Sequence, residues 1–109
     1  MTSLSTHVLD LAHGCPAVGV SVRLLRDGAL MSEARTDADG RCPALPAADP
    51  GRYALEFAVA DYFRARGVAL PDPPFLDVVT IAFGIADARS HYHVPLLVSP
   101  FGYSTYRGC

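Results

Sequence analysis

The chain has 109 residues, half of them hydrophobic, and a net charge of −2. This length predicts a single domain over residues 1–109, and the hydrophobic content suffices for a packed core. Without an excess of positive charge, the chain lacks the electrostatic signature of proteins that bind nucleic acid or an anionic membrane surface.

The cysteines and the N-terminal segment bear on the cellular compartment. Cys15, Cys42 and Cys109 cannot all pair within one chain, and no two have the C-x-x-C spacing of zinc or redox motifs. The first residues lack the basic and apolar regions of a signal peptide, and no apolar run approaches the roughly 20 residues that span a bilayer. We therefore expect a soluble cytoplasmic domain with free thiols and no membrane partner.

Alternating hydrophobic and polar residues, typical of half-buried strands, dominate the chain. In the first such segment the face with Leu4 and Val8 is predicted to lie in the core, which leaves His7 on the other face. The Asp27-Gly28 pair predicts a hairpin, because both residues tolerate the backbone of a type I′ turn. In chain order the predicted strands are residues 4–11, 18–25, 29–35, 52–58, 78–83, 91–99 and 101 or 102 to 107, with a loop or very short strand at 43–51.

One stretch, residues 59–66, has helical rather than strand periodicity. Val59, Tyr62 and Phe63 recur at the spacing of one helix face, and Gly67 follows as a natural C-cap. Seven or eight short strands with one short helix are typical of an antiparallel β-sandwich, so we predict an all-β fold of this kind.

Two histidines lie close together in the strand predicted at residues 91–99. Tyr92 and Val94 share the face predicted to be buried, whereas His91 and His93 share the other face with Leu97. A face that mixes histidines with leucine is typical of a subunit interface or a lined cleft.

Each polar residue also has an ordinary structural interpretation. A single histidine such as His7 or His93 is more often a surface or hydrogen-bonded residue than a catalyst, and Arg41, which follows a turn, is more often a solvated charge. His91 and His93 could offer two metal ligands from one strand, but no third ligand is evident, so a zinc site is disfavoured. Ser104 lacks the G-x-S-x-G motif of a serine hydrolase.

Several segments, in order along nearly the whole chain, resemble the hydroxyisourate hydrolases of the transthyretin-like family. The most specific are H-Y-H-V-P at residues 91–95 and the terminal Y-R-G-C at 106–109, where the family ends in Y-R-G-S. The others are L-S-T-H-V-L-D at 4–10, T-D-A-D-G-R at 36–41, G-R-Y at 51–53, D-Y-F at 61–63 and P-F-L at 74–76.

This resemblance implies an eight-stranded transthyretin-like sandwich with one short helix, assembled as a homotetramer whose paired subunits frame a channel with the active sites. The family's catalytic histidines match His7 and His93, and its active-site arginine matches Arg41. No metal and no cofactor are implied. The terminal segment that would contact substrate matches Tyr106, Arg107, Gly108 and Cys109. Cys109 stands where the family has serine, and a thiol hydrogen-bonds less well than a hydroxyl.

The function that the resemblance implies is hydrolytic opening of the small molecule 5-hydroxyisourate in urate degradation. One histidine would act as general base for water, and Arg41 would stabilise the developing oxyanion. A transthyretin-type protein that carries a small aromatic hormone in the same channel remains an alternative, which His93 and Tyr106 disfavour because they make the channel polar. An inactive structural module is a third interpretation, if Cys109 disables the site.

Overall fold

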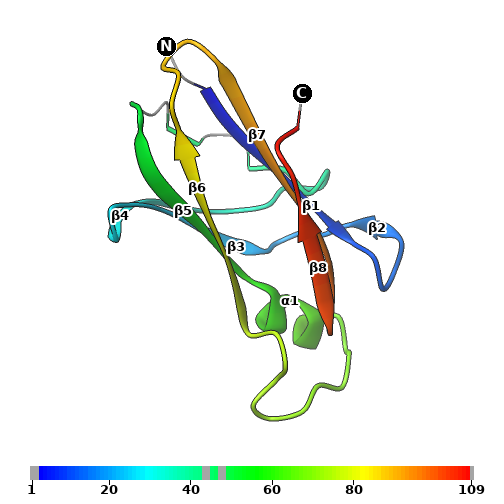
Figure 1. Ribbon diagram of the computed structural model, residues 1–109. Coiled ribbons are helices and arrows are strands. Elements are labelled where there is room, and N and C mark those ends of the chain that lie inside the picture. Colours follow the sequence, from blue (N-terminus) through cyan, green and yellow to red (C-terminus); the bar gives the residue numbers. More distant parts are fainter. Residues whose placement is uncertain (1–2, 43–44, 47–48, 109) are drawn as a thin grey trace.

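The computed structural model describes residues 3–42, 45–46 and 49–108, which form two four-stranded sheets packed face to face (Figure 1). One sheet has the strand order β2-β1-β7-β8 and the other has the order β4-β3-β5-β6. The predicted all-β sandwich with one short helix is confirmed. Its elements are β1 (Ser3–Asp10), β2 (Cys15–Pro16), β3 (Ser21–Arg26), β4 (Ala29–Arg35), β5 (Gly51–Ala58), α1 (Val59–Ala65), β6 (Val78–Ile85), β7 (His91–Ser99) and β8 (Gly102–Thr105).

The alternation of buried and exposed residues places the core between the two sheets, as predicted. Along β1, Leu4, Thr6 and Val8 are buried, whereas His7 is only partly buried. The buried face of β7 consists of Tyr92, Val94, Leu96 and Val98. The opposite sheet contributes Val22, Leu24, Leu55 and Phe57. The faces of β1 and β7 that carry the histidines therefore point away from the core.

One pairing departs from the predicted antiparallel arrangement. β1 and β7 run parallel, with Ser5 opposite His93 and His7 opposite Pro95, whereas the other described pairs are antiparallel. Parallel neighbours need a crossover connection, and here the whole second sheet lies between them in the chain. This register places β1, which carries His7, directly beside β7, which carries His91 and His93.

The strand predicted to begin at residue 18 begins instead at Ser21. The Thr36 hydroxyl accepts a hydrogen bond from Val20 N at 2.9 Å and donates one to Ala17 O at 2.6 Å. These side-chain bonds hold the backbone in a turn, and Val18 is 53% exposed within it. The hairpin at Asp27-Gly28 is confirmed, with positive φ at both residues.

Other boundaries also differ from the prediction. Leu11 lies in an exposed turn rather than at the end of the first strand, because Asp10 Oδ1 accepts a hydrogen bond from His13 N and bends the chain there. The last strand ends at Thr105 rather than at 107, since its pairing with β7 ends there. β2 (Cys15–Pro16) lies outside the predicted strands. Of the loop predicted at 43–51, residues 43–44 and 47–48 lie outside the described residues.

The helix α1 lies at one end of the sandwich, and its buried face consists of the residues predicted from their spacing (Figure 1). Val59, Tyr62 and Phe63 are all buried, and the helix ends before Gly67. Within the described ranges, no helix has the length and apolar character needed to cross a membrane.

Candidate active site

Three predicted residues converge on the outer face of the β2-β1-β7-β8 sheet. His7 on β1 forms an isolated backbone bridge with Arg41, which comes from the turn after β4. His93 on β7 pairs with Ser5, two residues before His7 on the same face of β1. Both Arg41 and His7 act electrostatically on His93. One chain therefore assembles the two imidazoles and the guanidinium from three separate segments.

A tight turn places Arg41 against β1. Asp37 Oδ1 accepts hydrogen bonds from Asp39 N at 2.9 Å and Arg41 N at 3.0 Å, and these backbone donors lower the pKa of the Asp37 carboxyl. Gly40 has a φ of +76°, and its carbonyl accepts from Val8 N at 2.8 Å. A Cβ at Gly40 would lie 2.5 Å from Val8 O, so only glycine lets the turn approach the strand this closely.

The position of the proton on His7 follows from its partner. His7 Nε2 lies 2.8 Å from the carbonyl oxygen of Asp39, which can only accept a hydrogen bond. The proton of the neutral ring therefore lies on Nε2, and Nδ1 is its basic nitrogen. The turn that carries Arg41 thus also orients His7.

His93 is held in a half-buried position by contacts on two sides. Its Nδ1 lies 2.7 Å from Ser5 Oγ, and its carbonyl accepts a hydrogen bond from Gly108 N at 2.8 Å. Burial, followed by the charges of Arg41, His91 and His7, lowers the pKa of His93. The ring is therefore neutral at neutral pH, in the form that can accept a proton.

Gly108 lies directly against the His93 ring. A Cβ on Gly108 would lie 2.5 Å from His93 Cδ2 and 3.1 Å from Cγ. The end of the described chain therefore covers one side of the imidazole, and a larger residue there would displace it.

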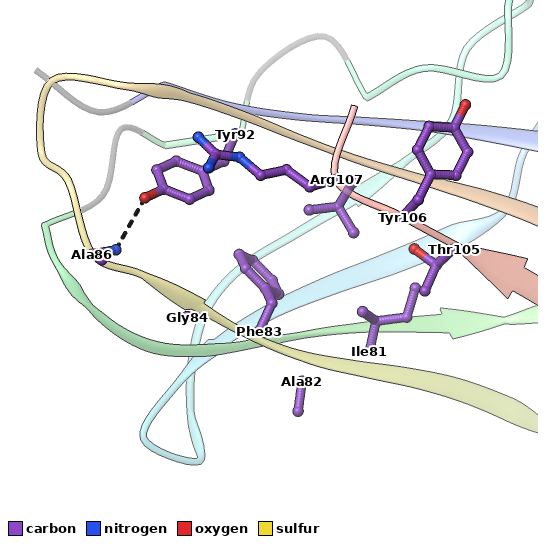
Figure 2. A pocket seen from close by; sticks show the side chains of 10 residues that line it. Ile81, Ala82, Phe83, Gly84, Ala86, Tyr92, Thr105, Tyr106 and Arg107 are labelled. Carbon is purple, nitrogen blue, oxygen red and sulfur yellow. Dashed lines mark hydrogen bonds between the residues drawn. The ribbon is translucent and has the colours of Figure 1, made fainter. Parts of the chain in front are cut away.

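Arg107, also predicted to bind substrate, does not join His93 within one chain. The Arg107 guanidinium lies 4.1 Å from the centroid of the Tyr92 ring, on the opposite face of β7 from His93. Tyr106 is 61% exposed, and Figure 2 shows its ring pointing away from Phe83, whereas Arg107 reaches over Tyr92. Cys109 lies outside the described residues.

A cavity of about 420 Å³ lies between the edge strands β6 and β8 (Figure 2). Its lining is mainly apolar and consists of Ile81, Ala82, Phe83, Gly84, Ala86, Tyr92, Val94, Thr105, Tyr106 and Arg107. None of His7, Arg41 and His93 lines it. The histidine cluster thus lies on the outer face of the sheet, separate from this cavity.

The histidines of β7 face a serine rather than further metal ligands. The rings of His91 and His93 lie with their centroids 6.5 Å apart, and Ser5 Oγ hydrogen-bonds to both. Among the residues that the structure describes, no group of three or more His, Cys, Asp or Glu side chains converges on a point where a metal could bind.

Sequence reasoning missed Ser5 and the carbonyl of Asp39. Strand alternation places Ser5 and His7 on the same face, which was a usable signal. The partner of Ser5 depends on the parallel register of β1 and β7, however, and local sequence does not specify that register.

The sequence is similar to known proteins over its whole length. A sequence model described as the HIUase/Transthyretin family matches residues 4–108. The curated 5-hydroxyisourate hydrolase of Pseudomonas aeruginosa is 55% identical to this chain, and the match covers 99% of the chain and 92% of that protein.

Solved structures share the fold. An (S)-allantoin synthase superposes with a TM-score of 0.93 at 39% identity, and the match covers 99% of this chain but 44% of that longer one. The Klebsiella pneumoniae 5-hydroxyisourate hydrolase gives a TM-score of 0.86 at 38% identity, with 98% and 99% covered. Transthyretin from Sparus aurata also gives 0.86, at 28% identity, with 96% and 95% covered. Proteins of different named functions therefore share this scaffold, and the site must decide between them.

Proposed function

Since the chain belongs to the HIUase/Transthyretin family, we propose that it hydrolyses 5-hydroxyisourate to 2-oxo-4-hydroxy-4-carboxy-5-ureidoimidazoline, a step of urate degradation. The observation that carries this proposal is the convergence of His7, Arg41 and His93 on one face of the sheet. The high identity to a curated 5-hydroxyisourate hydrolase supports the same substrate. In this proposal the protein is a hydrolase that acts on a cyclic amide.

His93 is the general base in this mechanism. The Ser5 hydroxyl occupies its Nδ1, which leaves Nε2 to take a proton from the attacking water. The lowered pKa of His93 keeps that nitrogen unprotonated at neutral pH. A cationic ring could not act as a base, so burial and the nearby guanidinium favour the reactive form.

Arg41 and His7 act on the substrate rather than on the water proton. The Arg41 guanidinium is permanently charged and offers a planar set of donors to the carbonyl oxygen that becomes an oxyanion. The Nδ1 of His7 accepts a hydrogen bond from the substrate, because its Nε2 proton is committed to Asp39 O.

The steps then balance as follows. Water loses a proton to His93 Nε2, and its oxygen attacks the ring carbonyl beside Arg41. When the C–N bond breaks, His93 returns the proton to the departing nitrogen. The new carboxylic acid then loses a proton at neutral pH, so one proton is released in each turnover.

The test is the rate at which freshly generated 5-hydroxyisourate disappears, compared with its spontaneous decay. Wild-type protein is expected to accelerate the loss. The variants His7→Ala, Arg41→Lys and His93→Gln are each expected to reduce the rate, the last by ~10²–10⁴-fold. Wild-type turnover in all three variants would refute the assignment of these residues.

We also propose that the protein is a homotetramer in which a second copy covers the face of the sheet that carries His7 and His93. Tyr103 and Tyr106, 47% and 61% exposed, lie at the end of the chain that borders His93. Sedimentation should give about four times the 11.6 kDa of one chain. A stable monomer that still turns over substrate would contradict this assembly.

A transthyretin-type carrier is the competing function, favoured by the match to transthyretin from Sparus aurata. A carrier would bind a small aromatic ligand tightly and leave hydroxyisourate decay unchanged. Calorimetry with such a ligand, run beside the activity assay, separates the two functions.

A further inference from the structure

Two serines and two histidines form one hydrogen-bonded chain on the outer face of the sheet. Ser5 Oγ lies 2.7 Å from His93 Nδ1 and 2.9 Å from His91 Nε2, and Ser3 Oγ lies 2.5 Å from His91 Nδ1. The parallel register produces this series, because it sets Ser3 opposite His91 and Ser5 opposite His93. The two rings are nearly parallel, with 14° between their planes.

Ser5 can pass a proton between the rings, because its hydroxyl group both accepts and donates hydrogen bonds. A hydroxyl has one hydrogen to donate and two lone pairs to accept. When His93 is cationic, its Nδ1 proton bonds to Ser5 Oγ while the Ser5 hydrogen bonds to His91 Nε2. A shift of both hydrogens along these bonds makes His93 neutral and His91 cationic.

The surroundings of the two rings set the direction of transfer. His93 is half-buried, and Arg41 and His7 face it from the turn and from β1, so its cationic form is disfavoured. His91 is exposed to solvent, and its own backbone carbonyl accepts a hydrogen bond from Arg107 at 3.4 Å. Transfer of a proton from His93 to His91 is therefore favourable, because the positive charge moves away from Arg41 and toward water.

We propose that Ser5 and His91 form a proton exit, which carries the proton released in each turnover from His93 to solvent. This inference rests on the proposed hydrolysis, in which a carboxylic acid product must lose one proton. That proton passes from the product to His93 Nε2, from His93 Nδ1 to Ser5 Oγ, and from Ser5 to His91 Nε2. His91 releases its Nδ1 proton to water. After product leaves, water takes the Nε2 proton of His93 and supplies a proton to His91 Nδ1, while the hydrogens of Ser5 and His91 Nε2 shift back, so that each turnover releases one proton in total. Ser5 and His91 are positioning residues, since neither touches substrate.

The experiment compares kcat and KM of four variants at low buffer concentration and with added imidazole. Ser5→Ala and His91→Ala are expected to lower kcat at least ~10-fold, less than the ~10²–10⁴-fold cost of losing the base itself. We expect KM to stay unchanged. Added imidazole should restore kcat, because it accepts the proton that His93 can no longer pass to His91. Ser5→Thr, which keeps a hydroxyl, and Ser3→Ala, which lies beyond His91, should behave like wild type.

A readout that does not depend on activity is the ¹⁵N spectrum of the imidazole nitrogens. Loss of the Ser5 hydroxyl should change the chemical shift of His93 Nδ1 in Ser5→Ala, whereas Ser3→Ala should leave it unchanged. An unchanged His93 spectrum in Ser5→Ala would contradict the hydrogen bond on which the exit depends.

The outcomes separate this inference from the proposed function. If wild-type protein does not accelerate hydroxyisourate loss, the proposed function fails. If wild type is active but Ser5→Ala and His91→Ala keep its kcat, or lose kcat without rescue by imidazole, the proton exit is wrong and the function stands. If Ser5→Ala does not fold, the exposed position of His91 lets His91→Ala decide.

Discussion

Two histidine clusters at opposite ends of β1 differ in what surrounds the imidazole. Beyond the last residue of the strand, His13 Nδ1 lies 2.6 Å from Asp10 Oδ2, and the Tyr62 hydroxyl donates to the same oxygen at 2.7 Å. Toward the other end, the groups that act on His93 are Arg41, His91 and His7. His13 is therefore paired with a carboxylate, whereas His93 is surrounded by two other imidazoles and a guanidinium.

The groups around each imidazole determine its role, so that one cluster stabilises the fold and the other is suited to catalysis. Burial by itself would raise the pKa of Asp10, but hydrogen bonds from Tyr62 and His13 outweigh it and lower the pKa. Asp10 is 1% exposed and remains charged, so it ties the turn after β1 to α1. Burial and Arg41 instead lower the pKa of His93 and leave it neutral. In the first cluster both carboxylate oxygens of Asp10 are hydrogen-bonded, whereas the second holds a neutral imidazole beside Arg41 and His7.

The sharpest test of this contrast is one substitution made in both clusters. His93→Gln is expected to lower kcat by ~10²–10⁴-fold, because it removes the general base, with little change in the unfolding midpoint. His13→Gln is the matched control, which should keep kcat and lower the midpoint. Kinetics and urea unfolding of both variants check this. Equal losses of activity would mean that the clusters do not divide the roles in this way.

A smaller effect is expected when the ring of His93 is displaced rather than removed. Gly108→Ala places a methyl group 2.5 Å from His93 Cδ2, so the ring must move, and a displacement of this size can cost ~10²-fold in kcat. Gly102→Ala is the control in the neighbouring strand, because its Cβ would meet nothing closer than 4.0 Å. Similar kcat values for the two variants would show that the close approach of Gly108 does not matter.

On the structural side, Asp10→Asn is expected to lower the unfolding free energy by ~1.5–3 kcal/mol, the usual contribution of hydrogen bonds to a charged group. Because the folded pKa of Asp10 lies below its usual 3.8, this stabilisation is present above pH 3.8 and is lost as the pH falls through the folded value. Urea titrations of both proteins across this range should therefore converge at low pH. A constant difference at every pH would contradict the role of the charge.

The smallest effect concerns the titration of His93. Its pKa should lie below the usual 6.5, and Arg41→Gln should raise it because one of the nearby charges is removed. Imidazole proton shifts followed by NMR across this pH range measure both values. A pKa that does not respond to Arg41→Gln would place the guanidinium too far from the ring to stabilise charge beside it.

Much of the sandwich was predictable because its signals are local. Alternation identified the buried faces of β1 and β7, the Asp27-Gly28 pair identified the hairpin, and helical spacing identified α1. Strand ends were predicted wrongly where a side chain replaces a backbone group as the hydrogen-bond partner. Thr36 holds the chain before β3 in a turn, and Asp10 does the same after β1.

For the site, the residue types were predictable and their partners were not. His7, Arg41 and His93 were identified from motifs, and the structure brings them together. Arg107, predicted to bind substrate, lies over the Tyr92 ring on the other face of β7, a partner that its motif does not specify.

By itself, the sequence determined the strands, the helix and the side chains available for chemistry, because periodicity and turn residues act over a few positions. Only the tertiary structure decided that β1 and β7 lie parallel, which sets Ser5 against His93 across 88 residues of chain. That choice depends on hydrogen bonds and packing between distant segments. It determines which nitrogen of His93 remains basic and where its proton can go.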